Sequence, residues 1–183
     1  MELTKNFIYS SNIIKSTLFV LIGSALLAIS SKIQTPFTVV PATMQTFVVM
    51  FLGIVLGYKL ATLSVVLYLI EGSFGLPVFA KGGGIGYLLG PTGGYIIGFI
   101  FTAFFAGHIN NKKDPIVIFL YLLFSVSIIY VLGLGGLWNY MGLNTNFSEI
   151  FLIGAKPFLL IEIYKILILT VLSKQLFKFR KFI

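Results

Sequence analysis

Cysteine is absent from this chain, and charged residues are scarce. Of its 183 residues only 10% are Asp, Glu, Lys or Arg, whereas 58% are hydrophobic. A soluble domain has about a quarter of its residues charged, so most of this surface must face something other than water. Without cysteine, disulfides, thiol catalysis and cysteine metal sites are excluded. Together with a mean hydropathy of +1.04, the composition predicts an all-α integral membrane protein.

Catalytic and nucleotide-binding patterns are missing too. The chain has one histidine, His108, and one aspartate, Asp114, both near the same predicted turn. A Ser-His-Asp set or a metal site therefore cannot be assembled. The phosphate-loop pattern GxxxxGK(S/T) is absent, and the glycines at 82–86 do not fit GxGxxG. We expect no enzyme activity, no metal and no cofactor.

Apolar runs predict one membrane domain, residues 1–183, with six transmembrane helices. A signal peptide competes for the first run, but no good cleavage site follows it and the rest is equally apolar. A single helix from Met44 to Glu71 would bury Lys59 at a cost of at least ~2.5 kcal/mol, so we prefer a hairpin that turns at residues 57–59. Pro91, Asp114-Pro115 and Pro157 open later helices. The predicted helices are approximately 15–33, 44–57, 60–71, 91–108, 115–133 and 157–177.

Residues 72–94 contain nine glycines and two prolines, so we expect neither a helix nor a strand to run through them. The segment is nevertheless too apolar for a solvated linker. Such a loop is tolerated in a membrane protein where protein buries it or a cavity wets it. It is a candidate wall or lid of a site. The alternative is a loosely packed external loop.

The basic residues predict the orientation. Nucleic-acid binding would need them clustered on a polar face, but they lie in short segments between apolar runs, as topology signals do. With six spans, nine of the thirteen basic residues share the side of both termini, which the positive-inside rule places in the cytoplasm. These nine are Lys5, Lys15, Lys59, Lys112, Lys113, Lys174, Lys178, Arg180 and Lys181; Lys32, Lys81 and Lys156 fall outside, and Lys165 lies within a helix.

Glu162 and Lys165 are ionisable residues inside the last apolar run. Their spacing of three puts them on one helical face, and a charge at membrane depth is costly unless it is paired or faces a cavity. A ligand-binding face is the interpretation we favour. A structural ion pair and a proton relay are the alternatives. Gln45, at the start of the second helix, either caps that helix or points into a pocket.

Several ordered blocks stand out along the chain: VPATMQTFVV from Val40, GLPVFA from Gly75, GYLLGPTGGY from Gly86, and PFL from Pro157 with Lys165 eight residues after the proline. Together they resemble the BioY family, the biotin-binding S components of energy-coupling-factor (ECF) transporters. The resemblance covers about Ile33 to Lys165. It implies six helices, a pocket closed by a glycine-rich external loop between helices 3 and 4, and biotin as ligand. It also implies a transmembrane coupling subunit and two cytoplasmic ABC-type ATPases as partners, in the bacterial cytoplasmic membrane.

The resemblance also implies which residues form the site. The substrate-binding residues would be Gln45, Phe79, Lys81, Tyr87, Tyr95, Glu162 and Lys165. Ser24 and Ala28, small residues of helix 1, would let a partner helix approach closely. Two positions depart from the family's pattern: Glu162 stands where Asp is usual, and Lys81 where a small residue or an amide is expected. Lys81 either meets the carboxylate of biotin or projects into solvent.

The sequence therefore predicts a membrane subunit that captures biotin from outside and translocates it with an ATPase module. Glu162 would accept hydrogen bonds from the ureido N–H groups, and Lys165 would donate to the ureido oxygen. A self-contained permease for biotin or another small carboxylated solute is the first alternative. A membrane-embedded enzyme is the second, and the missing catalytic residues argue against it.

Overall fold

The fold is all-helical, as expected. The computed structural model describes residues 2–35, 39–110 and 114–180, and within them no strand is formed, only two isolated bridges. The helices are α1 Glu2–Ser31, α2 Gln45–Ser73, α3 Ile85–Leu88, α4 Gly93–Ala106, α5 Pro115–Met141, α6 Phe147–Gly154 and α7 Leu159–Phe179. The predicted turn at Lys112 and Lys113, and Lys181 at the chain's end, lie outside the described residues.

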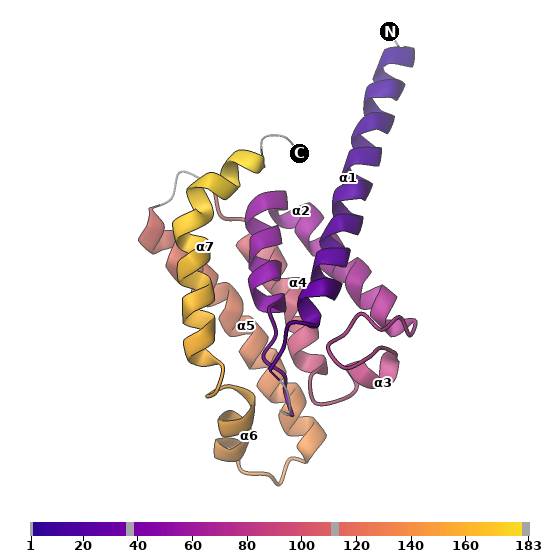
Figure 1. The fold of residues 1–183 in the computed structure, drawn as a ribbon. Helices are drawn as coiled ribbons and strands as arrows, with labels where there is room; N and C mark the ends of the chain where they lie inside the picture. The colour runs from indigo at the N-terminus through magenta and orange to yellow at the C-terminus, as the bar shows by residue number, and fades with distance from the viewer. Residues whose placement is uncertain (1, 36–38, 111–113, 181–183) are drawn as a thin grey trace.

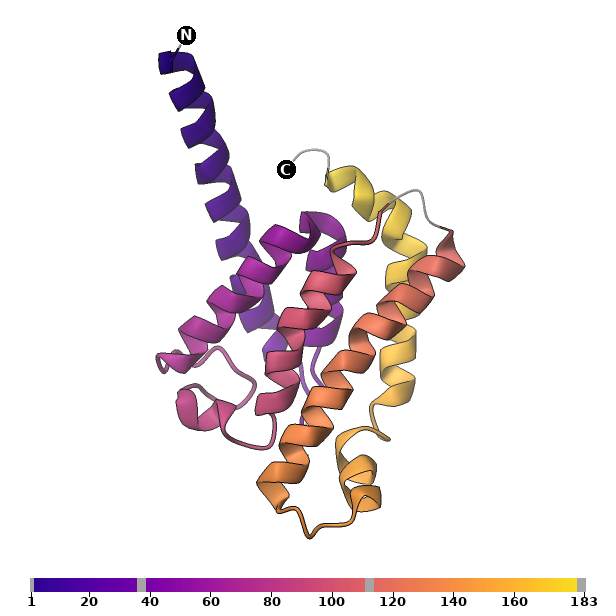
Figure 2. The same cartoon turned by 180° about the vertical axis from the view of Figure 1, so that it is seen from behind.

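The second helix, α2, is a hairpin of two helical arms. Gly57 interrupts it with φ +76° and ψ 170°, a positive φ that glycine adopts without the steric penalty of a Cβ atom. The arm after Gly57 runs back toward the end of the molecule at which α2 begins (Figures 1 and 2). The break therefore falls within the turn predicted at residues 57–59, and it leaves Lys59 exposed rather than buried in the middle of a long helix.

α4 lies at the centre of the bundle, in contact with both α2 and α5. α1 packs on α2, and α7 packs on α2 and α5. The start of α1 and the end of α7 lie at one end of the molecule, and α3 and α6 lie at the other (Figure 1). We call these the terminal end and the loop end. The distribution of basic residues predicts which of the two ends faces the cytoplasm.

Arg180 joins three segments at the terminal end. Its guanidinium donates to the carbonyls of Gly107, at 2.6 Å, and Ile109, at 2.8 Å, which satisfies acceptors left open where α4 ends. A Cβ atom at Gly57 would contact the same guanidinium. The α2 turn, the end of α4 and the end of α7 therefore meet at one point.

Glycines bring α4 and α5 into close contact. A Cβ atom at Gly136 would lie 3.1 Å from the Cα atom of Gly94, and one at Gly98 would lie 2.8 Å from the Cα atom of Ile129. The prediction that this helix ends at about residue 133 is wrong, since α5 continues to Met141. Gly94, Gly98 and Gly136 serve helix packing, which small residues promote in membranes, rather than helix termination.

Other boundaries also differ from the prediction. α1 begins at Glu2 rather than at residue 15. α4 begins at Gly93, because Pro91 and Thr92 belong to the turn before it. α7 begins at Leu159 rather than at Pro157. No helix runs through the glycine-rich segment, as expected, although one helical turn, α3, forms inside it.

Large apolar side chains cover the outside of the bundle. Among the described residues, three helices are long and apolar enough, by length and composition, to cross a membrane: Ile13–Ser31 of α1, Gln45–Ser73, which is the α2 hairpin taken as a whole, and Pro115–Met141. Ile14 of α1, Val131 of α5 and Val171 of α7 are each more than two-thirds exposed. Water would make this surface unfavourable, whereas lipid solvates it. The structure therefore fits a membrane-embedded bundle.

Candidate functional site

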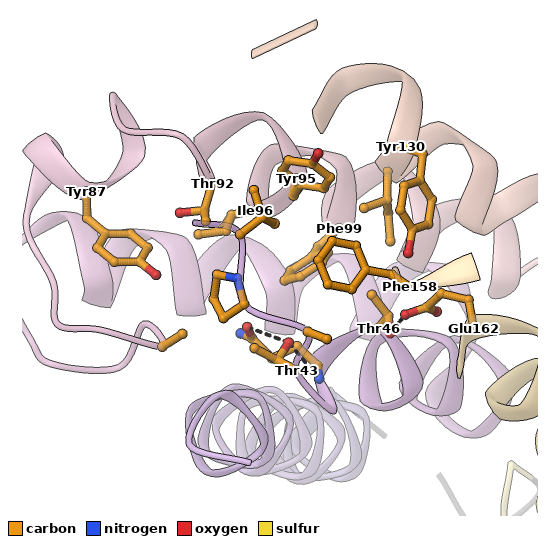
Figure 3. Close-up of a pocket in the computed structure, with 16 residues that line it drawn as sticks. Thr43, Thr46, Tyr87, Thr92, Tyr95, Ile96, Phe99, Tyr130, Phe158 and Glu162 are labelled. Carbon is orange, nitrogen blue, oxygen red and sulfur yellow. Dashed lines mark hydrogen bonds between the residues drawn. The ribbon is translucent and has the colours of Figure 1, made fainter. Parts of the chain in front are cut away.

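A cavity lies among α2, α4, α5, α7 and two loop segments, and encloses about 520 Å³ including the space open to solvent. Its walls are mostly apolar and aromatic with a few polar groups, as is typical of small-molecule sites. Tyr87 and Glu162 lie at its opposite ends (Figure 3). The lining residues are Val40, Pro41, Ala42, Thr43, Gln45, Thr46, Ala80, Tyr87, Thr92, Tyr95, Ile96, Phe99, Ile129, Tyr130, Phe158 and Glu162.

Glu162 brings a carboxylate to one end of the cavity. Its Oε1 atom accepts hydrogen bonds from Thr46 Oγ1 and from Lys165 Nζ, each at 2.8 Å. Its Oε2 atom is buried and has no hydrogen-bond partner among the described residues. A buried acceptor without a partner costs about 1–3 kcal/mol or more when charged. Oε2 is therefore ready to accept a hydrogen bond from a ligand.

Lys165 lies behind Glu162, one helical turn further along α7. Its ammonium donates to the Thr43 carbonyl at 2.7 Å, to Thr46 Oγ1 at 2.8 Å and to Glu162 Oε1. A lysine ammonium has three N–H donors, and all three are used here. In the described structure Lys165 lines a separate hollow beside Ile33 and Ile161 rather than the cavity. Its contact with a ligand stays a prediction.

Gln45 lines the cavity and connects two of its walls. Its Nε2 atom donates to the hydroxyl of Tyr68 at 2.6 Å, and its Oε1 atom accepts from Thr43 Oγ1 at 3.2 Å. Tyr68 in turn donates to the carbonyl of Val78, at 3.2 Å, in the glycine-rich segment. The glutamine is more than nine-tenths buried, and this series of hydrogen bonds fixes the orientation of its side chain.

Phe79 and Tyr87 form the wall contributed by the glycine-rich segment. Phe79 is fully buried, stacks on Tyr87 with 5.1 Å between ring centroids, and meets the ring of Tyr68 edge-on. A Cβ atom at Gly72 would overlap the Phe79 ring. Tyr87 lines the cavity directly, whereas Phe79 supports it from behind. The segment is thus packed against protein around Phe79, whereas Phe74, Ile85 and Leu89 are exposed.

Lys81 lies outside the cavity, on an adjoining hollow of about 760 Å³ that we call the vestibule. The vestibule shares Pro41, Tyr87 and Thr92 with the cavity, so the two spaces meet at these residues. Lys81 is exposed. It would therefore reach a ligand only at the Tyr87 end, away from Glu162.

Tyr95 lines the cavity with its ring but directs its hydroxyl elsewhere. The hydroxyl donates to the carbonyl of Gly154, at 2.9 Å, at the end of α6. The ring occupies the space beside Gly133, where a Cβ atom would overlap it. Tyr95 therefore supplies an apolar surface to the cavity and anchors α6.

The structure adds lining residues that were not predicted. Thr46 follows Gln45 in the MQTF block, and Thr92 and Phe158 lie in the LLGPTGG and PFL blocks, so the blocks themselves carried a signal for them. No sequence signal pointed to Tyr130, because it lies in a uniformly apolar run. Figure 3 places Tyr130 and Phe158 beside Glu162.

Ser24 and Ala28 lie on the α1 face that meets α2. Ser24 is 1% exposed and donates a short hydrogen bond to Oε2 of Glu71, and Ala28 packs against the core. A Cβ atom at the neighbouring Gly23 would overlap Ser64 of α2. In this structure the small residues therefore allow α1 to pack closely on α2 of the same chain. That a partner helix contacts them stays a prediction.

The arrangement suits reversible binding. The described residues contain no group of three or more His, Cys, Asp or Glu that could hold a metal ion. The cavity offers one carboxylate oxygen as acceptor, threonine hydroxyls beside it, and aromatic walls. A ligand with N–H donors at one end and an apolar body would be held well there.

Comparisons with known sequences agree on one family. A sequence model described as "BioY family" matches residues 3–182. The chain is 37% identical over 153 residues to the "Probable biotin transporter BioY" of Pyrococcus horikoshii, covering 83% of this chain and 90% of that one. It is 36% identical over 159 residues to the "Biotin transporter BioY" of Thermotoga maritima, covering 86% and 92%.

A solved structure also resembles this one. It is the crystal structure at 2.1 Å of the S-component for biotin from an ECF-type ABC transporter. The TM-score is 0.78 and the identity 26%, over 92% of this chain and 93% of the other. The similarity in fold therefore extends over nearly the whole chain.

Proposed function

This chain belongs to the BioY family, and we propose that it is the biotin-binding membrane subunit of an uptake transporter. Membership makes it a transport protein rather than an enzyme. In the proposed cycle it captures biotin from outside and passes it inward with the help of an ATPase module.

The Glu162 carboxylate carries the proposal. Biotin's ureido ring has two N–H donors and one carbonyl. Glu162 lines a cavity with no other carboxylate among its lining residues, and its buried Oε2 atom has no partner among the described residues. A charged acceptor forms hydrogen bonds of about 1.5–3 kcal/mol. Lys165 and Thr46 occupy Oε1, so Oε2 would be the oxygen that accepts from the ligand.

The rest of the cavity supports the same ligand orientation. The aromatic rings of Phe99, Tyr95 and Tyr87 line the path away from Glu162, and they suit the thioether ring and the apolar valerate chain. At the far end Lys81 lines the vestibule, where the valerate carboxylate would lie in this orientation. Lys81 would then be its electrostatic partner, whereas Phe79 would act by supporting Tyr87.

The partners and the orientation belong to this proposal as well. Without a phosphate-binding loop the chain is not expected to hydrolyse ATP by itself, so a transmembrane coupling subunit and two cytoplasmic ATPases would supply the energy. The basic residues place the terminal end in the cytoplasm and the loop end outside. The proposed location is the bacterial cytoplasmic membrane, with six spans if both α2 arms are counted.

Equilibrium binding by the purified chain tests the proposal. We expect one biotin per chain and saturable binding, and much weaker binding of an analogue that lacks the ureido ring. Equal affinity for the two compounds would remove Glu162 as the reason for recognition. Absence of biotin binding would defeat the proposal itself.

Uptake into proteoliposomes separates the proposal from a self-contained permease. The chain alone should bind biotin without concentrating it, and uptake should appear when the coupling subunit and ATPases are added with ATP. Concentrative, nucleotide-independent uptake by the chain alone would favour the permease. A chemically altered product after incubation would favour an enzyme.

A further inference from the structure

Three side chains at the end of α1 bond four consecutive carbonyls of the glycine-rich segment. Lys32 Nζ donates to Pro77 O at 2.7 Å and to Phe79 O at 2.6 Å. Ser31 Oγ lies 2.8 Å from Val78 O and 2.7 Å from Ala28 O of its own helix, so its single proton is shared between these two acceptors, and Gln34 Nε2 donates to Ala80 O at 3.0 Å. We call Ser31, Lys32 and Gln34 the α1 anchor.

The anchored segment has little regular structure of its own. Around Phe79 its backbone makes one isolated bridge, Phe79 N to Gly82 O at 2.9 Å, and glycines surround it. Glycine-rich backbone loses much conformational entropy when it is ordered. Bonds from outside the segment must offset that cost, and the α1 anchor provides four of them.

The same stretch also holds a second wall of the cavity. Thr35 N donates to Ala42 O and Met44 N donates to Ile33 O, each at 3.0 Å. Ala42 and its neighbours line the cavity on the side of the link between α1 and α2. Residues 31–35 therefore connect both loop walls to one helix end.

We infer that Lys32 is a positioning residue for the ligand site: it holds the Phe79–Tyr87 wall closed and so slows ligand release. The proposal rests on biotin being the ligand. Lys32 lines neither the cavity nor the vestibule in the described structure, so it acts through the wall and not on the ligand. Its two bonds are charge-assisted, and no other cation is bonded to these carbonyls among the described residues.

Lys32→Met tests this, because it keeps the apolar stem and removes the donors. We expect the dissociation rate of biotin to rise roughly tenfold, equivalent to about 1.4 kcal/mol, with a smaller change in the association rate. Lys32→Arg retains the donors and should restore most of the affinity. Lys156→Met, an exposed lysine at the loop end, controls for loss of one positive charge and should bind as wild type.

Biotinol, in which an alcohol replaces the carboxylate, separates positioning from direct charge recognition. If Lys32 acts by positioning the wall, the Lys32→Met variant should bind biotin and biotinol more weakly than wild type by the same factor. Weakening confined to biotin would mean that Lys32 meets the ligand carboxylate, and would overturn the inference. An unchanged dissociation rate for both ligands would overturn it as well.

A ligand-free measurement keeps this test independent of the proposed function. Hydrogen–deuterium exchange at residues 76–88 should be faster in Lys32→Met, while exchange in α5 and the unfolding temperature stay unchanged. A lower unfolding temperature with faster exchange throughout would indicate a general structural role and overturn the inference. If wild type fails to bind biotin, the proposed function fails, whereas the exchange result still decides the anchor.

Ser31→Ala is the second variant should Lys32→Met fail to fold. It removes one anchor donor and no charge, so it should change exchange and dissociation in the same direction by a smaller factor. No change in either quantity would count against the anchor.

Discussion

Lys165 lies one turn after Glu162 on α7, and its ammonium nitrogen is 2.8 Å from the Oε1 atom of Glu162. Both residues are more than nine-tenths buried. The two carboxylate oxygens differ: Oε1 is bonded twice, whereas Oε2 has no partner among the described residues. One side chain can therefore be part of a structural pair and of a ligand site. Mutations must separate these roles.

Glu162→Gln should weaken biotin binding roughly ten- to a hundredfold. The amide keeps the shape but loses the charge, and a charged hydrogen bond is worth about 1.5–3 kcal/mol. The unfolding temperature should fall as well, because the change leaves the buried Lys165 ammonium without a counter-charge, although its bonds to Thr43 and Thr46 remain. Isothermal titration measures the affinity. The exposed Glu149, changed to Gln, is the matched control, and equal affinity of both variants would contradict a ligand role for Glu162.

Glu162→Leu combined with Lys165→Met should give a stable protein that no longer binds biotin. Removing one partner strands a buried charge, which costs about 3–5 kcal/mol, but removing both avoids that penalty. Thermal unfolding and biotin binding are measured for both single variants and the double variant. Wild-type affinity in the stable double variant would show that the pair is structural only.

Local spacing predicted this pair, but not its surroundings. Residues spaced three apart on one helix are neighbours, so Glu162 and Lys165 could be placed together from sequence. Thr46, which bonds both of them, is 116 residues from Glu162 along the chain. Only the packing of α2 on α7 brings it there, and no short-range pattern encodes that contact.

The same distinction explains the errors in helix boundaries. The hairpin of α2 followed from the cost of burying Lys59, a local property. The glycines at 133–136 looked like a helix end because their intrinsic helix propensity is poor. Their environment decides otherwise: α4 lies so close that a Cβ atom at Gly136 would be 3.1 Å from Gly94 Cα. Such tertiary contact cannot be read from propensity.

Single cysteines should report the orientation of the bundle. The native chain has none, so Lys59→Cys and Lys156→Cys each introduce a unique thiol at an exposed position. In intact cells an impermeant maleimide should label residue 156 and not residue 59, since the positive-inside rule puts the α2 turn in the cytoplasm. Labelling at 59 alone would reverse the orientation. Permeabilised cells, in which both should react, provide the control.

Two glycines in the α4–α5 pair should respond oppositely to the same substitution. At Gly98 a Cβ atom would lie 2.8 Å from the Cα atom of Ile129, and a backbone atom cannot move aside without shifting α5. Overpacking of this kind costs about 1–3 kcal/mol, more than the up to about 1 kcal/mol that alanine gains over glycine in a helix. At Gly135 no described atom lies within 4 Å of the added carbon, so alanine there keeps only the gain.

We therefore expect Gly98→Ala to unfold at a lower temperature than wild type in detergent and Gly135→Ala to unfold at the same or a higher one. Ile129 also lines the cavity, so Gly98→Ala should weaken biotin binding in addition, whereas Gly135→Ala should not. Equal unfolding temperatures for the two variants would mean that α4 and α5 are not in close contact at Gly98.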